Sequence, residues 1–244
     1  RFNRNLVDHM RLFVSGSAPL LSETHIQFKK ITGHKILERY GMTETNMNTS
    51  NPYNGERRAG TVGLPLPGVE LKITDPETAK ELSIDEIGKI EVRGPNVFKG
   101  YWKMPEKTKT ELRKNGFFIT GDLGKIDQDG YVHILGRDKD LIISGGYNIY
   151  PKEVEEVIDD QTGVLESAVI GVPHPDFGET PIAIIVSETE IVPNLDVIES
   201  SLSKSLARYK HPKKLFLIDQ LPRNTMGKVQ KNILREEYKS LFAD

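Results

Sequence analysis

The fold is decided by residues 35–44, which have the sequence Lys35-Ile36-Leu37-Glu38-Arg39-Tyr40-Gly41-Met42-Thr43-Glu44. The first half, residues 35–39, predicts a strand, and it runs directly into a polar half that predicts a loop. Upstream, residues 11–14 predict another short strand, and residues 23–30 predict a helix that is closed by Gly33. This part of the chain is therefore typical of an α/β fold, whose ligands gather at the carboxyl ends of strands.

The middle of the chain has a different pattern of predicted elements. Short predicted strands at residues 69–74, 88–93, 117–120 and 131–135 are separated by Pro-Gly, Asn-Gly and Asp-Gly turns. A helix is predicted at residues 105–113, with a proline in its first turn. This pattern indicates a small β-rich barrel or sheet.

A charged connector at residues 136–140 predicts a domain boundary, which divides the chain into residues 1–137 and 138–244. Beyond the connector, strands and helices alternate and predict a small α+β domain. The helices are predicted at residues 151–160, 195–206 and 231–239, and the strands at 167–172, 182–186 and 214–218.

Composition excludes several classes of protein. The formal net charge of the 244 residues is −2, which gives no electrostatic case for a nucleic-acid partner. Absence of cysteine excludes disulfides and thiolate metal sites, and it is consistent with a cytoplasmic protein. No apolar run approaches the ~18 residues of a membrane span. The chain opens at Arg1 within a charged, helix-like stretch, so we expect it to be a piece of a longer protein.

Two patches in the first domain carry possible chemistry. In the first, Thr43 offers a hydroxyl to a phosphate and Glu44 offers a carboxylate to Mg²⁺, although an ordinary polar loop is the alternative. In the second, Asp122 follows Gly121 at the end of a predicted strand, where its carboxylate could accept both hydroxyls of a ribose. A β-turn aspartate is the alternative there.

Two further patches lie at and beyond the connector. Arg137 could hold a ribose or a phosphate, and the paired glycines of residues 145–146 permit a close backbone approach or a hinge. Lys228 follows Gly227 in a predicted loop and could deliver a positive charge to phosphate or carboxylate oxygens. A solvated loop and a solvated lysine are the alternatives. The six histidines have no metal-ligand spacing, and the sequence contains neither a Gly-x-Ser-x-Gly elbow nor a Walker-type phosphate loop.

Taken in order, these patches resemble the motif series of the adenylate-forming enzymes. The series consists of residues 40–44, residues 120–122, Gly136-Arg137 with Lys139, and residues 222–228. The family includes acyl-CoA synthetases, peptide-synthetase adenylation domains and firefly-type luciferases, and the resemblance covers essentially the whole chain. Within the family, residues 38–52, 94–102 and 222–232 resemble malonyl-CoA synthetases.

The resemblance implies an architecture. Residues 1–137 would be the end of a large AMP-binding domain, consisting of an α/β segment and a small β-barrel, and residues 138–244 would be a small, mobile α+β domain. The family's phosphate loop would lie upstream of Arg1. Much of the acyl pocket would lie there too, including the residue that pairs with the distal carboxylate of malonate. We therefore expect the isolated chain to be inactive.

The resemblance also implies a reaction. The family makes an acyl-adenylate from a carboxylate and ATP, releases pyrophosphate, and then lets the thiol of coenzyme A attack the adenylate. The expected ligands are accordingly ATP or AMP, Mg²⁺ and coenzyme A. The catalytic residues would be Thr43 at the α-phosphate, Glu44 on Mg²⁺, and Lys228 between the substrate carboxylate and ATP.

The remaining site residues also follow from the resemblance. Gly16, Ser17 and Ala18 would line the adenine and acyl pocket, and Tyr40, with Gly41 and Met42 in the same motif, would lie near adenine. Asp122 and Arg137 would hold the ribose. Lys139 would be the hinge between the domains, and Gly145 would border the tunnel of the pantetheine arm.

Several functions stay open at this point. Malonate is the expected substrate, and methylmalonate or acetate is the alternative within the same reaction. A peptide-synthetase-like domain would pass its acyl group to a carrier protein, and a non-catalytic nucleotide-binding fragment belongs to a different class. Because the amine of Lys228 is expected to be exposed, a lysine acetyltransferase and deacetylase are possible partners.

Overall fold

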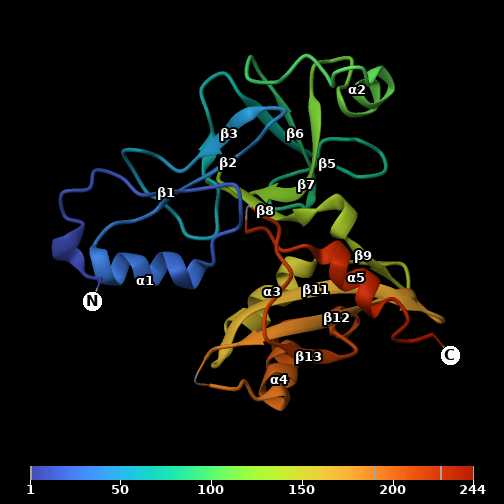
Figure 1. The fold of residues 1–244 in the computed structure, drawn as a ribbon. Coiled ribbons are helices and arrows are strands. Elements are labelled where there is room, and N and C mark those ends of the chain that lie inside the picture. Colours follow the sequence, from blue (N-terminus) through green and yellow to red (C-terminus); the bar gives the residue numbers. More distant parts are fainter. Residues whose placement is uncertain (1, 190, 226, 244) are drawn as a thin grey trace. The chain divides into compact units, whose positions relative to one another are not determined.

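A computed structural model describes residues 2–189, 191–225 and 227–243 (Figure 1). The chain divides into two compact units, Arg1–Ile134 and Leu135–Asp244. The expected functional boundary between residues 137 and 138 stays a prediction. Strand β8 (Val132–Arg137) crosses the point at which the two units divide.

The first unit begins with a four-stranded sheet in the order β1-β2-β3-β4. After the short helix η1 (Arg4–Leu6), β1 (Val14–Ser15) pairs in parallel with β2 (Leu37–Met42), and α1 (Ser22–Thr32) connects them. β3 (Asn46–Ser50) and β4 (Leu64–Pro65) extend the sheet in antiparallel fashion. Gly33 closes α1 in the left-handed conformation, with φ of 79°, so the expected helix end is confirmed.

The motif at residues 40–44 differs from its prediction. Tyr40, Gly41 and Met42 belong to β2 rather than to a loop, and only residues 43–45 form the turn into β3. The physical reason is the β2–β3 hairpin, whose strands approach so closely that a Cβ on Gly41 would lie 1.9 Å from the carbonyl oxygen of Asn46. The absent side chain lets the strand continue where the polar composition favours a loop.

A second four-stranded sheet completes the first unit. It has the order β5-β6-β7-β8, with β5 (Glu70–Thr74), β6 (Gly88–Arg93) and β7 (Phe118–Ile126) before β8. Helix α2 (Pro105–Glu111) lies between β6 and β7 and starts with Pro105 in its first turn, as predicted. Within the described residues, the edge strands β5 and β8 do not pair with each other, so the expected barrel is an open sheet.

The second unit is an α+β domain. Its five-stranded sheet consists of β9 (Ile142–Ser144), β10 (Tyr147–Ile149), β11 (Val164–His174), β12 (Gly178–Ser187) and β13 (Leu215–Ile218). Its helices are α3 (Pro151–Asp159), α4 (Leu195–Ser205) and α5 (Lys231–Tyr238), with the short helices η2 (Asp138–Asp140) and η3 (Arg208–Lys210). β9 and β10 form a hairpin in a segment that the sequence placed in a connecting loop.

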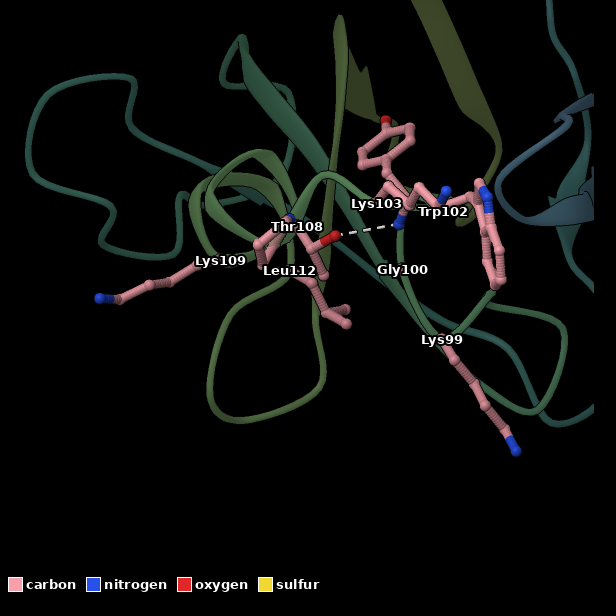
Figure 2. Close-up of a pocket in the computed structure, with 9 residues that line it drawn as sticks. Lys99, Gly100, Trp102, Lys103, Thr108, Lys109 and Leu112 are labelled. Carbon is pink, nitrogen blue, oxygen red and sulfur yellow. Dashed lines mark hydrogen bonds between the residues drawn. The ribbon is translucent and has the colours of Figure 1, made fainter.

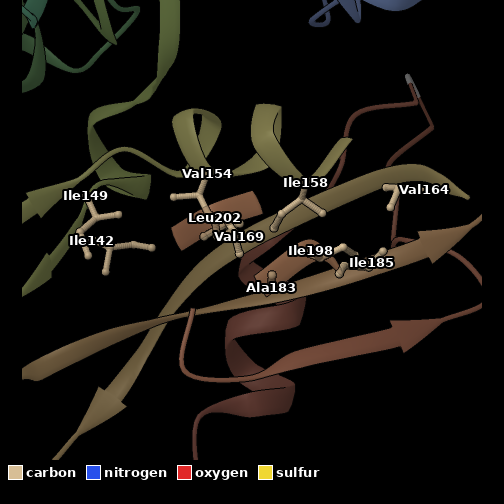
Figure 3. Packing of buried hydrophobic residues seen from close by; sticks show 10 residues of the cluster. All are labelled: Ile142, Ile149, Val154, Ile158, Val164, Val169, Ala183, Ile185, Ile198 and Leu202. Atoms are coloured by element: carbon tan, nitrogen blue, oxygen red, sulfur yellow. The ribbon is translucent and has the colours of Figure 1, made fainter. Parts of the chain in front are cut away.

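Both faces of this sheet are covered by apolar side chains. Val169 and Ile185 point into a cluster with residues of α3 and α4 (Figure 3), while their neighbours Ile170 and Ile184 point into a cluster with Leu234 of α5. Alternate residues of a strand point to opposite faces, which is why β11 and β12 have nearly continuous apolar sequences. Among the described residues, no helix is long and apolar enough to cross a membrane.

Candidate functional site

Tyr40 and Asp122 meet between the two sheets of the first unit. The Tyr40 hydroxyl donates a hydrogen bond to Oδ2 of Asp122, and the two residues are 8% and 5% exposed. The amide of Asp122 also donates to Oγ1 of Thr120 at 3.1 Å. Asp122 was expected at a strand end, but it lies inside β7, because that strand continues to Ile126. The structure brings together two residues that are 82 positions apart in the sequence.

Glu44 lies in the turn after β2, beside an exposed Thr43. The hydroxyl oxygen of Tyr101 lies 3.2 Å from Oε1 of Glu44 and 2.5 Å from Oε2 of Glu111. Burial, together with these two carboxylates, raises the pKa of Tyr101 well above its usual range, so the phenol remains a hydrogen-bond donor. Tyr101 lies 57 residues from Glu44, so no local pattern in the sequence connected the two.

The chemistry of Glu44 fits a magnesium site that is completed by a substrate. Mg²⁺ is usually bound through one or two carboxylates plus phosphate oxygens and water, so a single carboxylate suffices. Among the described residues, no group of three or more histidine or acidic side chains could hold a metal by itself. A metal at Glu44 would therefore depend on bound nucleotide.

A shallow pocket of about 400 Å³ lies beside α2. Figure 2 shows its lining, in which the Tyr101 amide donates to Oγ1 of Thr108 at 2.9 Å and the long side chains of Lys99 and Lys109 extend away from the backbone. Trp102 is 85% exposed at its rim. None of the expected site residues lines this pocket, but the lining residue Tyr101 contacts Glu44.

Gly16, Ser17 and Ala18 follow β1 directly, next to the carboxyl-terminal half of β2. A Cβ on Gly16 would lie 3.1 Å from Cγ and 3.4 Å from Cζ of Arg39, so the guanidinium lies against this turn. Arg39 is half-buried, and its Nη1 contacts the sulfur of Met47 at 2.7 Å. No carboxylate of the described residues forms an ion pair with Arg39. No motif in the sequence pointed to a role for this residue.

The other expected residues lie in the second unit or at its border. Arg137 ends β8, and Lys139 lies within η2, where both side chains are exposed. Gly145 is at the tip of the β9–β10 hairpin with φ of 56°, and its amide donates to the carbonyl of Phe177 at 2.9 Å. A residue other than glycine would be strained at this tip.

Exposed aromatic residues lie on the segments next to Gly145, and the Phe177 ring is 3.5 Å from the position of a Cβ on Gly145. Tyr147 stacks on Tyr209 with ring centroids 4.7 Å apart, and the ammonium of Lys213 lies 5.2 Å from the ring centroid of Phe177. We call Tyr147, Phe177, Tyr209 and Lys213 the aromatic cluster. Exposed aromatic rings beside cations suit a planar, anionic ligand such as a nucleotide. These residues are far apart in the sequence, and no motif pointed to them.

Lys228 is exposed in the loop between β13 and α5. Its amide donates to Oδ1 of Asn224 at 2.9 Å, and its carbonyl accepts from the Asn224 amide at 3.0 Å. The expected motif at residues 222–228 includes Met226, which lies outside the described residues. The roles expected for Lys228 and for the other site residues stay predictions.

Comparisons with known proteins agree with the motif order. The model of the AMP-binding enzyme family matches residues 2–102, and that of the AMP-binding enzyme C-terminal domain matches residues 153–228. A probable CoA ligase of Humulus lupulus, CCL8, is 45% identical over 93% of this chain and 39% of its own length. A malonate–CoA ligase of Arabidopsis thaliana is 42% identical over 93% of this chain and 38% of its own length.

Among solved structures, ATP-bound MatB from Rhodopseudomonas palustris is 61% identical, with a TM-score of 0.96. The match covers 99% of this chain and 48% of the MatB chain. The chain thus spans about two-fifths to one-half of the length of the proteins that it matches. With both family models and the whole described fold in agreement, the chain belongs to the AMP-binding, adenylate-forming enzymes.

Proposed function

We propose that the protein containing this chain is an AMP-forming acyl-CoA synthetase that acts on malonate. In the first half-reaction, a carboxylate oxygen attacks the α-phosphorus of ATP and pyrophosphate leaves. In the second, the thiol of coenzyme A attacks the acyl carbon of the adenylate and AMP leaves. Family membership and the CoA-ligase relatives support the reaction type.

The expected residues have the chemistry that the first half-reaction requires. A carboxylate and a triphosphate repel each other, so positive charge must be placed where they meet. Lys228 would supply that charge, and Mg²⁺, when bound with ATP at Glu44, would neutralise the phosphates. Thr43 would donate to the α-phosphate, and Asp122 and Arg137 would hold the ribose. Acetylation of Lys228 would remove its charge, so a regulatory acetyltransferase is part of this proposal.

Arg39 is the observation that favours a dicarboxylate. Its half-buried guanidinium lies against Gly16, contacts only a thioether by hydrogen bond, and shares β2 with the motif that leads to Thr43 and Glu44. A partly buried cation without a carboxylate partner is costly unless a ligand supplies the anion. The distal carboxylate of malonate would do so. The resemblance predicts that the residue that pairs with this carboxylate lies upstream of Arg1. Arg39 is a candidate for the same role within the chain.

Substitution of Arg39 tests the choice of substrate. In the longest natural protein that contains these residues, Arg39→Met should lower kcat/KM for malonate about 10- to 100-fold, the loss expected for a charged hydrogen bond. Propionate has a methyl group in place of the distal carboxylate, so its kcat/KM should be unchanged or higher. Equal losses with the two acids, measured by pyrophosphate release, would reject the assignment. Methylmalonate and acetate in the same assay separate the remaining alternatives.

The aromatic cluster supports coenzyme A rather than a carrier protein as the thiol donor. Gly145 would let the pantetheine arm pass, and the stacked rings of Tyr147 and Tyr209 would hold the adenine. Lys213 would face the phosphates. A free acyl-CoA product would distinguish this enzyme from a carrier-dependent adenylation domain, which makes no free thioester.

A further inference from the structure

The loop that carries Lys228 is tied to the rest of its unit at both ends. We define the Lys228 loop as residues 222–230, which lie between β13 and α5 and run directly into Lys231. Inside it, Asn224 accepts from the amide of Lys228, and the amide of Gly227 donates to the carbonyl of Asn224 at 2.9 Å. These bonds fix a turn, but they do not fix where the turn lies relative to the sheet.

The first tie involves Arg223. One of its nitrogens forms an ion pair with Glu166 of β11, and the other donates to the carbonyl of Gly227 at 2.6 Å. Arg223 thereby joins strand β11 to the backbone directly before Lys228. A guanidinium suits this task because its planar fork can donate to two acceptors at once.

The second tie involves Lys231, at the start of α5. Its ammonium lies 2.5 Å from Oε1 of Glu155 on α3, and the same oxygen accepts from the amide of Val169 on β11 at 2.7 Å. The side chains of Lys231 and Glu155 are only 18% and 15% exposed. Limited exposure makes this pair less sensitive to solvent screening than an ordinary surface pair.

We infer that Glu155 and Glu166 are positioning residues that hold Lys228 in place for adenylate formation. This inference rests on the proposed role of Lys228. Glu166 lies on β11 and Glu155 accepts from a β11 amide, so both ion pairs anchor the loop to the same strand. Displacement of a reacting group by about 1 Å can cost on the order of 10²-fold in rate, so two ties outside the reacting atoms have a measurable effect.

The test compares half-reactions in the longest natural protein that contains these residues. The double variant Glu155→Gln/Glu166→Gln should lower the rate of adenylate formation about 10- to 100-fold and leave KM for ATP nearly unchanged. Formation of acyl-CoA from preformed acyl-adenylate should keep its rate. Lys231→Arg, which retains the cation, should behave like the unaltered protein, whereas Lys231→Gln should lower the rate of adenylate formation because it removes the partner of Glu155.

Glu156 provides the matched control. It neighbours Glu155 on α3 and pairs with Lys152 at 3.7 Å, in a contact that does not involve the loop. Glu156→Gln should therefore change neither half-reaction. A readout independent of activity is tryptic cleavage after Lys228, identified by mass spectrometry. It should be faster in the double variant and unchanged in Glu156→Gln.

The outcomes separate this inference from the proposed function. Suppose that Lys228→Ala abolishes adenylate formation while the double variant keeps its rate. The positioning role is then wrong, and the proposed function stands. If Lys228→Ala lowers the rates of both half-reactions equally, the proposed role of Lys228 is wrong. The predicted effect of the double variant on adenylate formation then has no basis. An unchanged rate of cleavage after Lys228 in the double variant would show that the two ion pairs do not hold the loop in place.

Discussion

At the scale of single residues, the surroundings of each carboxylate decide its chemistry. Asp122 is buried and Glu44 is half-buried, and each accepts a hydrogen bond from a tyrosine hydroxyl. Asp159 at the end of α3 has a different environment. Burial raises its pKa to about 7, Glu155, Glu166 and Asp160 add to the rise, and a hydrogen bond from Ser167 opposes it. We expect this raised pKa to make stability depend on pH.

The sign of that effect follows from proton binding. Between its ordinary pKa of 3.8 and about 7, Asp159 keeps a proton in the folded state that it loses in the unfolded state. Stability should therefore fall as pH rises from about 4 to about 7 and should stay low above that range. Asp159→Asn retains an oxygen that accepts from Ser167 and removes the titration.

Thermal unfolding at two pH values measures this prediction. At pH 8, the Asp159→Asn variant should have a midpoint higher by about 4 °C or more, the shift that corresponds to about 1 kcal/mol in a small domain. At pH 4, the two midpoints should be nearly equal, because the unaltered Asp159 is then protonated. An equal difference at both values would contradict the raised pKa.

At the scale of elements, two hairpins carry Gly41 and Gly145 of the expected site. The β2–β3 hairpin needs Gly41 because the facing backbone leaves no room for a Cβ. The β9–β10 hairpin needs Gly145 and Gly146 because both have positive φ at its tip. In each hairpin, the backbone conformation at the site glycine is one that a residue with a side chain would disturb.

Gly145→Leu should separate the two half-reactions in the opposite way from Lys228. Its side chain would start 3.5 Å from the Phe177 ring and would fill the space next to the aromatic cluster. Acyl-CoA formation should fall at least about tenfold, whereas pyrophosphate release in the first turnover should persist. Gly145→Ala adds the same backbone strain with little bulk and serves as the control. An unchanged thioester rate in Gly145→Leu would end the tunnel interpretation.

At the scale of the whole molecule, the elements at the start of the first unit are packed less completely than the sheet of the second unit. In the second unit, apolar clusters cover both faces of the sheet. In the first, α1 buries only His25 and Thr32, while Phe2, Leu6, Ile26 and Ile31 are exposed. Exposed apolar side chains concentrated on neighbouring elements favour association.

We expect residues 135–244 to fold by themselves. A protein of these residues alone should unfold in one cooperative transition with urea and should remain monomeric in sedimentation experiments. Residues 1–134 alone should self-associate or precipitate. A non-cooperative transition of residues 135–244 would show that the second unit needs the first. The full 244-residue chain should release no pyrophosphate above background, and release would mean that it contains a complete site.

The sequence by itself determined the class of the fold, most elements and the order of the motifs. Amphipathic periodicity located α3 and α4, and Gly33 located the end of α1, because these signals are local. The motif series was sufficient for the family. Asp122, in contrast, was assigned to a strand end, since the length of β7 depends on pairing with β6, which local composition does not encode.

Tertiary structure alone decided which distant residues meet. Tyr101 reaches Glu44 across 57 positions, Lys231 reaches Glu155 across 76, and Arg39 comes to lie against Gly16 through the parallel pairing of β1 and β2. Each contact depends on strand register and helix packing, which are set by the burial of many side chains at once. A single residue type in the sequence carries no record of these contacts, so the sequence could place the expected site residues in order but could not supply their partners.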